Sequence, residues 1–237
     1  SATIERHNLE KEISLTNAKS ETGSIKVIKT LKYNGELDAE ANSFKVGIST
    51  EANPAKIEEA NIQTINVTNG TGYVVFAGLT VGETYYIYEV DGDGKPVGAS
   101  YEYEVTGNGT SKTIERGVLN YQVDLTNAKS ETGSIKVIKT LKYNGELDTE
   151  ANSFKVGISK EANPATINAA DIKTIDVTDG TGYVVFEGLT VGETYFIYEV
   201  DEEGKPVGEG YEYAVTGSGD SATIERHNLE KEISLTN

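Results

Sequence analysis

The sequence contains no cysteine, no methionine and no tryptophan, and only 4 of its 237 residues are proline. The absence of cysteine excludes disulfide bridges and thiolate metal sites, so any unusual stability must come from other bonds. No apolar run approaches the ~20 residues that a membrane-spanning helix needs, and no signal peptide is present. Because an initiator methionine is also missing, we expect the chain to be a piece of a longer protein.

Basic residues are scarce relative to acidic ones. The 21 Lys and Arg residues face 38 Asp and Glu residues, which gives a net charge of −17. Nucleic acids and anionic membranes both require basic patches, so neither is an expected partner. The sequence also lacks a histidine cluster, a Ser-His-Asp set and a phosphate-binding glycine loop. We therefore expect no cofactor, no metal site and no enzyme that acts on a separate substrate.

An internal repeat sets the organisation of the chain. Residues 18–127 align without a gap on residues 128–237, with 26 differences. Each copy has the size of one β-sandwich domain. Residues 1–17 are identical to residues 221–237. They are therefore predicted to be the terminal strands of a preceding repeat, in an array that alternates two repeat types.

Within each copy, short runs of alternating apolar and polar residues predict β-strands separated by Asn-Gly and Asp-Gly turns. Pro54–Asn61 is the one predicted helix, because proline suits a first turn and Ala, Glu and Lys follow. This pattern predicts an all-β chain of tandem immunoglobulin-like antiparallel β-sandwiches. The strands predicted in the first copy are Ser24–Leu31, Ser43–Ser49, Thr64–Val67, Gly72–Phe76, Thr84–Val90, Tyr101–Val105, Thr113–Glu115 and Tyr121–Thr126.

Three polar residues in each copy continue strand faces that are otherwise apolar. Lys29 shares its face with Ile25 and Val27, because alternate residues of a strand point the same way. By the same rule, Glu89 and Asn127 each extend the apolar face of their own strands. An ammonium buried without a partner costs several kcal/mol, so such a lysine must be neutral, paired or chemically consumed. The second copy carries the same residues as Lys139, Glu199 and Asn237.

These three residue types support a specific reaction. A desolvated neutral lysine is a nucleophile, an asparagine carboxamide is an electrophile, and a protonated glutamic acid polarises the carbonyl and shuttles protons. The product is a Lys–Asn isopeptide bond formed with loss of ammonia. The alternative is an unreacted buried Lys–Glu ion pair with asparagine as a hydrogen-bond partner. The residues alone leave both open.

Three segments resemble a known family. They are the pattern G-x-I-x-V-x-K at Gly23–Lys29, the segment GLTVGETYYIYE at Gly78–Glu89 and the closing LTN at Leu125–Asn127. They are similar to the collagen-adhesin B-type and streptococcal pilin-type domains of Gram-positive surface proteins. The resemblance covers both copies and implies a sandwich whose first and last strands are joined by a self-formed isopeptide bond. It implies cross-links Lys29–Asn127 and Lys139–Asn237, with Glu89 and Glu199 as single-turnover catalysts.

Two other motifs give weaker predictions. Thr30 and Gln122 suggest the ester cross-link of a related family, but Gln122 becomes Glu232 in the second copy, which removes the acceptor. The segment 91–95, DGDGK, resembles part of a calcium loop, but it lacks the spacing of an EF-hand. We predict a hairpin turn there.

The expected function is a structural stalk or fibre repeat of a bacterial surface adhesin or pilus-like protein, located outside the cell at the wall or in an appendage. Its expected partners are neighbouring repeats of the same array, with host surface molecules contacted through other regions. The alternative is an adhesive module in which exposed Tyr33, Tyr101 and Tyr103 bind host protein or glycan. Asn17 has no lysine strand before it and is expected to remain an unmodified amide.

Overall fold

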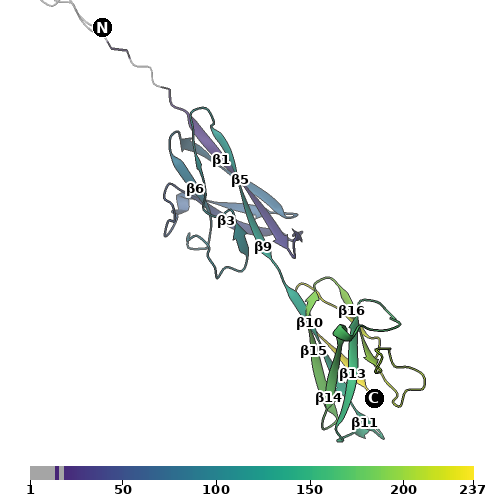
Figure 1. Ribbon diagram of the computed structural model, residues 1–237. Coiled ribbons are helices and arrows are strands. Elements are labelled where there is room, and N and C mark those ends of the chain that lie inside the picture. Colours follow the sequence, from purple (N-terminus) through teal and green to yellow (C-terminus); the bar gives the residue numbers. More distant parts are fainter. Residues whose placement is uncertain (1–13, 16–18) are drawn as a thin grey trace, which may run out of the picture. The chain divides into compact units, whose positions relative to one another are not determined.

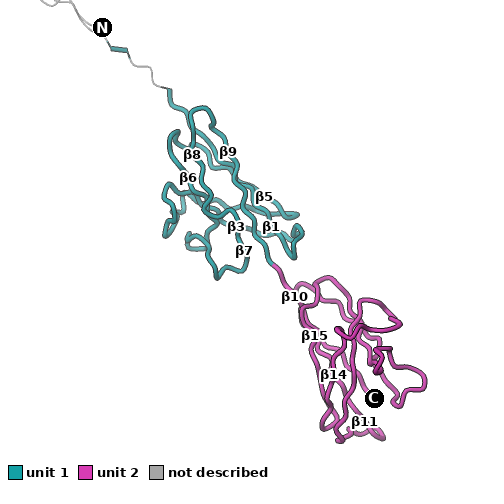
Figure 2. Tube along the Cα trace, viewed as in Figure 1, with its two compact units in different colours: residues 1–129 teal, residues 130–237 magenta. Residues whose placement is uncertain are grey.

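The computed structural model describes residues 14–15 and 19–237 and divides the chain into two compact units (Figures 1 and 2). Unit 1 comprises residues 1–129 and unit 2 residues 130–237. The division falls two residues beyond the predicted repeat boundary, because the last strand of unit 1 continues to Lys129. Asn17 and most of the predicted terminal strands at 1–17 lie outside the described residues.

Unit 1 consists of two sheets of short strands. The first contains β2, β1, β9 and β7 in that order, with β5 also paired to β1, and the second has the order β4-β3-β6-β8. The strands are β1 Thr22–Tyr33, β2 Glu36–Leu37, β3 Asn42–Ser49, β4 Ile62–Val67, β5 Thr71–Thr80, β6 Thr84–Val90, β7 Glu104–Thr106, β8 Thr110–Thr113 and β9 Asn120–Lys129.

Unit 2 repeats this arrangement. Its sheets have the orders β15-β10-β18 and β14-β13-β16-β17, with a separate β11-β12 ribbon. The counterpart of β7 is reduced to one bridge between Thr216 and Thr236. The strands are β10 Thr132–Thr140, β11 Lys142–Tyr143, β12 Glu146–Leu147, β13 Asn152–Ser159, β14 Ile172–Val177, β15 Thr181–Thr190, β16 Thr194–Val200, β17 Ser221–Thr223 and β18 Glu230–Thr236.

The predicted all-β class with antiparallel sheets is confirmed, with one exception in each unit. The first and last strands of a unit, β1 with β9 and β10 with β18, pair in parallel. A parallel pair needs a long crossover, and here most of the unit supplies it. Alternation of side chains reveals which residues face inward, but it does not give the direction of neighbouring strands.

The predicted helix at Pro54–Asn61 is wrong over most of its length. Only a single 3-10 turn forms, at η1 Glu59–Asn61, and its counterpart is η2 Ala169–Asp171. Ile57 is buried, and its backbone N–H donates to the Gly94 carbonyl at 2.8 Å, which holds this segment as an extended loop. A short segment with one apolar anchor does not offset the cost of nucleating an α-helix.

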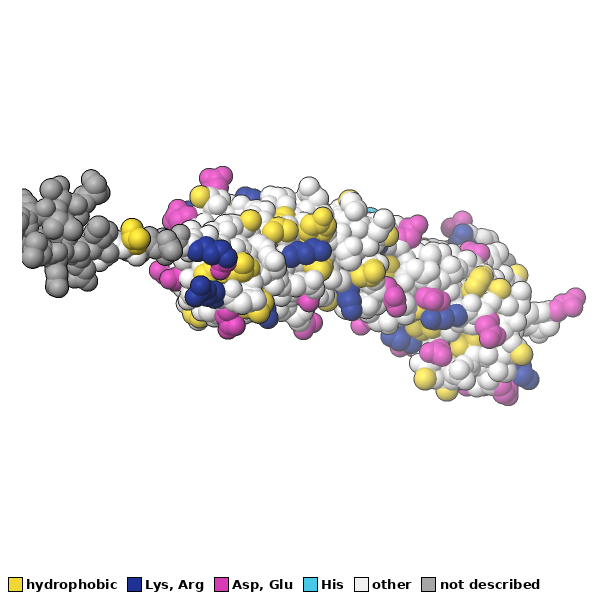
Figure 3. Space-filling view, turned by 90° about the horizontal axis from the view of Figure 1, so that it is seen from above, with side chains coloured by type: hydrophobic (Ala, Val, Ile, Leu, Met, Phe, Trp, Pro, Cys, Tyr) yellow, Lys and Arg dark blue, Asp and Glu magenta, His cyan; other side chains and the backbone are white. Residues whose placement is uncertain are grey.

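Each unit has its own core between its two sheets. Ile25, Val27 and Leu31 of β1 are fully buried in unit 1, where they pack with residues such as Ile87 and Leu125. The outer surface is charged, and Figure 3 shows acidic and basic side chains interspersed on the visible face. Within the described part of the chain, no helix has the length and apolar character to cross a membrane.

Candidate cross-linking site

Three strands bring the predicted site residues of unit 1 together. Lys29 lies on β1 and Asn127 on β9, which are parallel neighbours in one sheet. Glu89 lies on β6 in the facing sheet. All three side chains are 0% exposed. Opposite Lys29 on β5 stands Gly72, where an added Cβ would clash with the backbone carbonyl of Asn66 and with Ile65. The strands therefore approach closely beside the buried lysine.

The three side chains form a closed triangle of hydrogen bonds. The Lys29 ammonium donates to Glu89 Oε2 and, at 2.5 Å, to Asn127 Oδ1. The Asn127 amide Nδ2 donates to the other glutamate oxygen, Oε1, at 2.8 Å. The two oxygens of Glu89 thus face the two nitrogens that would exchange in an amide transfer. None of the buried side-chain nitrogen and oxygen atoms of the described residues lacks a partner.

Unit 2 contains the same triangle. Lys139 donates to Glu199 Oε2 and, at 2.5 Å, to Asn237 Oδ1, while Asn237 Nδ2 donates to Glu199 Oε1 at 2.9 Å. Lys139 and Glu199 are 0% exposed, but Asn237 is only half-buried. In unit 1, Asn127 is paired with Val105 of β7, which covers that end of the site.

Burial dominates the electrostatics of both lysines. Desolvation lowers the pKa of Lys29 below its usual range, and the charge and hydrogen bond of Glu89 oppose that shift. Lys139 has a lowered pKa for the same reason, opposed by Glu199. An aromatic ring also borders each amine, Phe44 at 5.0 Å and Phe154 at 4.8 Å from ring centre to Nζ. The ring face and the carboxylate favour the ammonium, but burial is the larger effect and favours the neutral, nucleophilic form of the amine.

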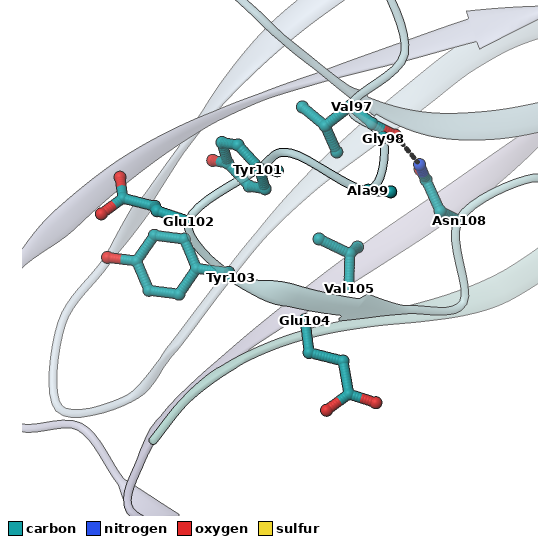
Figure 4. A pocket seen from close by; sticks show the side chains of 9 residues that line it. All are labelled: Val97, Gly98, Ala99, Tyr101, Glu102, Tyr103, Glu104, Val105 and Asn108. Atoms are coloured by element: carbon teal, nitrogen blue, oxygen red, sulfur yellow. Dashed lines mark hydrogen bonds between the residues drawn. The ribbon is translucent and has the colours of Figure 1, made fainter. Parts of the chain in front are cut away.

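A loop residue that the sequence did not indicate holds the backbone of the glutamate. The Glu89 N–H donates to Asn108 Oδ1 at 2.6 Å, and Asn108 Nδ2 donates to the Val97 carbonyl (dashed line in Figure 4). In unit 2, Ser218 Oγ accepts the Glu199 N–H at 3.2 Å. The only hint in the sequence is that both repeats have a residue with a side-chain oxygen acceptor at this loop position, asparagine in one and serine in the other.

The predicted exposed tyrosine set is partly wrong. Tyr103 is only 9% exposed and belongs to the core, while Tyr33 and Tyr101 are half-buried. The Tyr103 ring packs edge-on against Phe44, with centroids 5.7 Å apart. The segment at 101–105 forms a strand only from Glu104 onward, so alternation counted from Tyr101 gave no information on burial. The prominently exposed tyrosines are Tyr73, Tyr143 and Tyr183.

The two weaker motifs have ordinary structural explanations. Gln122 is paired with Lys26 on the β1–β9 ladder, and Thr30 with Thr126 four residues further along, so the ester pair is not assembled. Asp91 Oδ1 accepts backbone N–H groups of Asp93 and Lys95, which makes the segment a capped turn. No group of acidic and histidine side chains suited to a metal ion occurs among residues 14–15 and 19–237.

Comparisons with known proteins return structures of pilins. No family model and no curated protein sequence matches the chain. It is similar to the shaft pilin SpaA of Lactobacillus rhamnosus GG, at 14% identity and TM-score 0.31 over 91% of this chain and 98% of that one. It is also similar to the major pilin T3.2 of Streptococcus pyogenes, at 18% identity and TM-score 0.31 over 92% of this chain and 98% of the pilin. These are proteins of the kind that the sequence motifs resemble. The low TM-scores carry no argument about function, which has to rest on the geometry of the chain itself.

Proposed function

We propose that each unit forms an intramolecular Lys–Asn isopeptide bond without any other enzyme, and that the cross-linked units serve as stalk or fibre repeats outside a bacterial cell. The observation that carries the proposal is the buried triangle of lysine, glutamate and asparagine, present in both units. The bonds would join Lys29 to Asn127 and Lys139 to Asn237.

In the proposed reaction each polar group of the triangle has a role. Lys29 Nζ passes a proton to Glu89 Oε2, and the neutral amine then adds to Cγ of Asn127 while the carbonyl electron pair moves onto Oδ1. The carboxyl group takes a second proton from the attacking nitrogen and gives one through Oε1 to Nδ2. The Cγ–Nδ2 bond breaks with its electron pair on nitrogen, ammonia leaves, and the carbonyl re-forms. Glu89 is left protonated, as it was when the amine attacked.

Burial and positioning of the side chains would accelerate the reaction between the lysine amine and the asparagine amide. The amine and the amide oxygen lie 2.5 Å apart. Held reactants of this kind reach effective concentrations of ~10⁵ M or more, far above anything attainable between free side chains in water. The surrounding apolar core excludes water, which would otherwise solvate the ammonium and suppress its reactivity.

The unreacted ion pair is the competing interpretation. A salt bridge needs only lysine and glutamate, whereas here the asparagine contacts both, through its oxygen and its nitrogen. A buried ion pair is also weak as a stabilising device, because desolvation of the charges offsets their attraction. The triangle is therefore better explained as a set of reactants than as a structural salt bridge.

The strand arrangement supports a load-bearing role. Tension on unit 1 acts at the start of β1 and the end of β9, which are parallel neighbours paired from Ser24–Asn120 to Tyr33–Lys129. Pulling these ends apart loads the ladder in shear, so many hydrogen bonds resist together. A covalent Lys29–Asn127 link would carry the force between the two strands and shield the 98-residue interval from extension.

Intact mass combined with peptide mapping tests the proposal. The whole chain should weigh two ammonia molecules less than its sequence formula, and digestion should yield branched peptides that contain Lys29 with Asn127 and Lys139 with Asn237. Mapping is needed because Asn-Gly sequences, such as Asn34-Gly35, also lose ammonia when they form succinimides. The Lys29→Ala chain is the matched control and should retain only the second branched peptide. A mass equal to the formula would refute the isopeptide bonds.

A further inference from the structure

A row of three side chains reaches each buried lysine amine from the surface. In unit 1, the Asn42 amide Nδ2 donates to the hydroxyl of Tyr103 at 3.1 Å, and the Tyr103 ring packs edge-on against Phe44, with centroids 5.7 Å apart. The face of the Phe44 ring lies over Lys29, at 5.0 Å from ring centre to Nζ. The row therefore ends on the nucleophile of the proposed reaction.

Unit 2 repeats the row. Asn152 Nδ2 donates to the hydroxyl of Tyr213 at 3.0 Å, and the rings of Tyr213 and Phe154 have centroids 5.5 Å apart. The centre of the Phe154 ring lies 4.8 Å from Lys139 Nζ. Tyr213 is half-buried, whereas Tyr103 belongs to the buried core. The two units thus keep the same three contacts even though the exposure of the tyrosine differs.

Two residues of one strand hold the tyrosine. Asn42 and Phe44 are two apart on β3, so their side chains share one face, with Asn42 at the exposed end and Phe44 in the core. The Asn42 amide is itself fixed, because its Oδ1 accepts the Ser43 N–H at 2.8 Å. Tyr103 lies in the loop before β7 and lines a surface pocket of about 540 Å³ (Figure 4). It therefore links the wall of this pocket to the ring beside the amine.

A phenyl ring is well suited to border a nucleophilic amine. Its face attracts the ammonium while Lys29 still carries its proton. The ring has no N–H or O–H group, so once the proton has passed to Glu89, the lone pair of the neutral amine is left free for Cγ of Asn127. The Phe44 side chain is buried and takes up space that water would otherwise fill. Its position therefore limits where the amine lies without competing for the hydrogen bonds of the triangle.

We propose that Tyr103 and Tyr213 are positioning residues, each of which holds the neighbouring phenylalanine ring against the lysine amine and keeps that amine directed at its asparagine. This inference rests on the proposed function. The hydroxyl bond to Asn42 or Asn152 fixes the tyrosine ring, and the edge contact fixes the phenylalanine. The lysine side chain is long and flexible, and a misplacement of about 1 Å in a reacting pair can slow the reaction about a hundredfold.

A tyrosine that only fills space is the competing explanation. The loop around it changes between the repeats, since Ala99 becomes Glu209 and Glu104 becomes Ala214. Filling space alone would be met by phenylalanine, which has no hydroxyl group. Both units instead have a hydroxyl and bond it to an asparagine at the start of the strand that carries the phenylalanine. This hydrogen bond favours positioning over space filling.

The rate of cross-linking in the whole chain tests the proposal. Chains made by cell-free synthesis and quenched at once in denaturant are refolded by dilution, and the branched peptides of each unit are followed by mass over time. Tyr103→Phe keeps the ring and loses one hydrogen bond, so unit 1 should link about fivefold more slowly. Tyr103→Leu also loses the edge contact and should be slower by about thirtyfold. Unit 2 should react at its normal rate in both chains.

Conservative variants separate the anchor from general stability. Asn42→Asp retains an oxygen to which the tyrosine hydroxyl is able to donate, so its rate should stay within about twofold of wild type. Asn42→Ala should be as slow as Tyr103→Phe, and the double variant no slower, because both changes remove the same bond. Tyr85→Phe is the matched control, because its hydroxyl also accepts one hydrogen bond, from the Thr80 N–H. The same substitutions in the Lys29→Ala chain, which forms no bond in unit 1, report the rate and extent of folding itself.

Nuclear magnetic resonance detects the position of the ring directly. In the Asn127→Ala chain Lys29 stays unreacted, and the face of Phe44 should shift the signals of the lysine ε-methylene protons upfield. Adding Tyr103→Phe should reduce this ring-current shift, because the ring is then held less firmly over the amine. A tyrosine that merely stabilises the fold would leave the shift unchanged as long as unit 1 is folded.

The outcomes distinguish the two proposals. If unit 1 links at the wild-type rate in Tyr103→Phe and Tyr103→Leu, or if Tyr103→Phe links slowly with an unchanged ring-current shift, the positioning role is overturned and the proposed function stands. If neither unit of the wild-type chain loses ammonia, the proposed function itself fails. Should the changes at Tyr103 prevent folding of unit 1, the reciprocal Tyr213→Phe and Tyr213→Leu chains give the same measurement, with unit 1 as reference; a wild-type rate there would equally overturn the positioning role.

Discussion

The two units can be compared directly, because their aligned repeats, 18–127 and 128–237, differ at 26 positions and keep the same triangle. On the last strand the outward-facing Gln122 becomes Glu232, which lies 3.7 Å from Lys136 in unit 2. The inward-facing Val123 becomes only Ile233. At the outer end of that strand Tyr121 also becomes Lys231. Polar contacts on the outer face thus change freely, while the inner face stays apolar from Val123 to the asparagine.

The residues that support the glutamate show a second kind of difference. Asn108 in unit 1 is replaced by Ser218 in unit 2, yet both accept the backbone N–H of the glutamate, at 2.6 and 3.2 Å. The triangle therefore tolerates variation in its supports, and four sets of variants measure how much each part matters.

The largest effect is expected from Lys29→Ala. The Lys29–Asn127 bond would close a loop of 98 residues, and by analogy with disulfides such a link stabilises by about 4.7 kcal/mol. Unit 1 should still fold but should melt well below unit 2 and be cut first by protease. Calorimetry with intact mass checks this, with Lys26→Ala on the opposite face of β1 as control. Equal melting of the two units would show that no bond stabilises unit 1.

Glu89→Ala should have nearly the same effect, because the amine and the amide are then present but lack the proton relay. Its counterpart Glu199→Ala should remove the bond of unit 2 alone. Mass and melting temperature are measured for both single variants and for the double variant, with the exposed Glu102→Ala as control. If Glu89→Ala keeps its ammonia loss and the wild-type melting temperature, Glu89 is not the catalyst.

A smaller effect should appear in the dependence of stability on pH. Asn127→Ala leaves Lys29 unreacted, with a pKa that burial lowers relative to the unfolded chain. The unfolded state then binds more protons, so the free energy of unfolding of unit 1 should rise with pH up to about 10.4, the ordinary lysine pKa. In wild type the amide nitrogen does not titrate, and this rise should be absent. Denaturant unfolding between pH 7 and 10 tests the difference, and parallel curves would contradict it.

The sequence was most informative where strands alternate regularly. Lys29, Glu89 and Asn127 could each be placed on an apolar strand face because alternate residues of a strand point to the same side and one side of every strand in a sandwich is buried. The same alternation explains why most substitutions between the two last strands lie on the side that faces solvent. It gives no strand direction, however. The resemblance implied that the first and last strands are joined, but their parallel pairing was not predicted.

The parts that escaped prediction lie in loops. Pro54–Asn61 has helix-forming residues, but its conformation is set by the burial of Ile57 and its bond to Gly94. The segment around Tyr101 and Asn108 contains turns rather than a regular strand, so neither the burial of its rings nor its contacts with Glu89 follow from any sequence period. These tertiary contacts are the ones that complete the site.

The smallest effect is expected from exchanging the loop acceptors. Asn108→Ser gives unit 1 the support of unit 2, and Ser218→Asn does the reverse. Each exchange retains a side-chain oxygen for the glutamate N–H, so the cost should stay below about 1 kcal/mol and the rate of cross-linking within about threefold. Asn108→Ala, which leaves that N–H without its acceptor, should cost ~1–3 kcal/mol. Refolding with mass detection and melting of all three chains rank these changes. If Asn108→Ser stops the bond from forming while Ser218 supports it in unit 2, the two loops hold their glutamates by different means, and the equivalence of the units ends at the triangle itself.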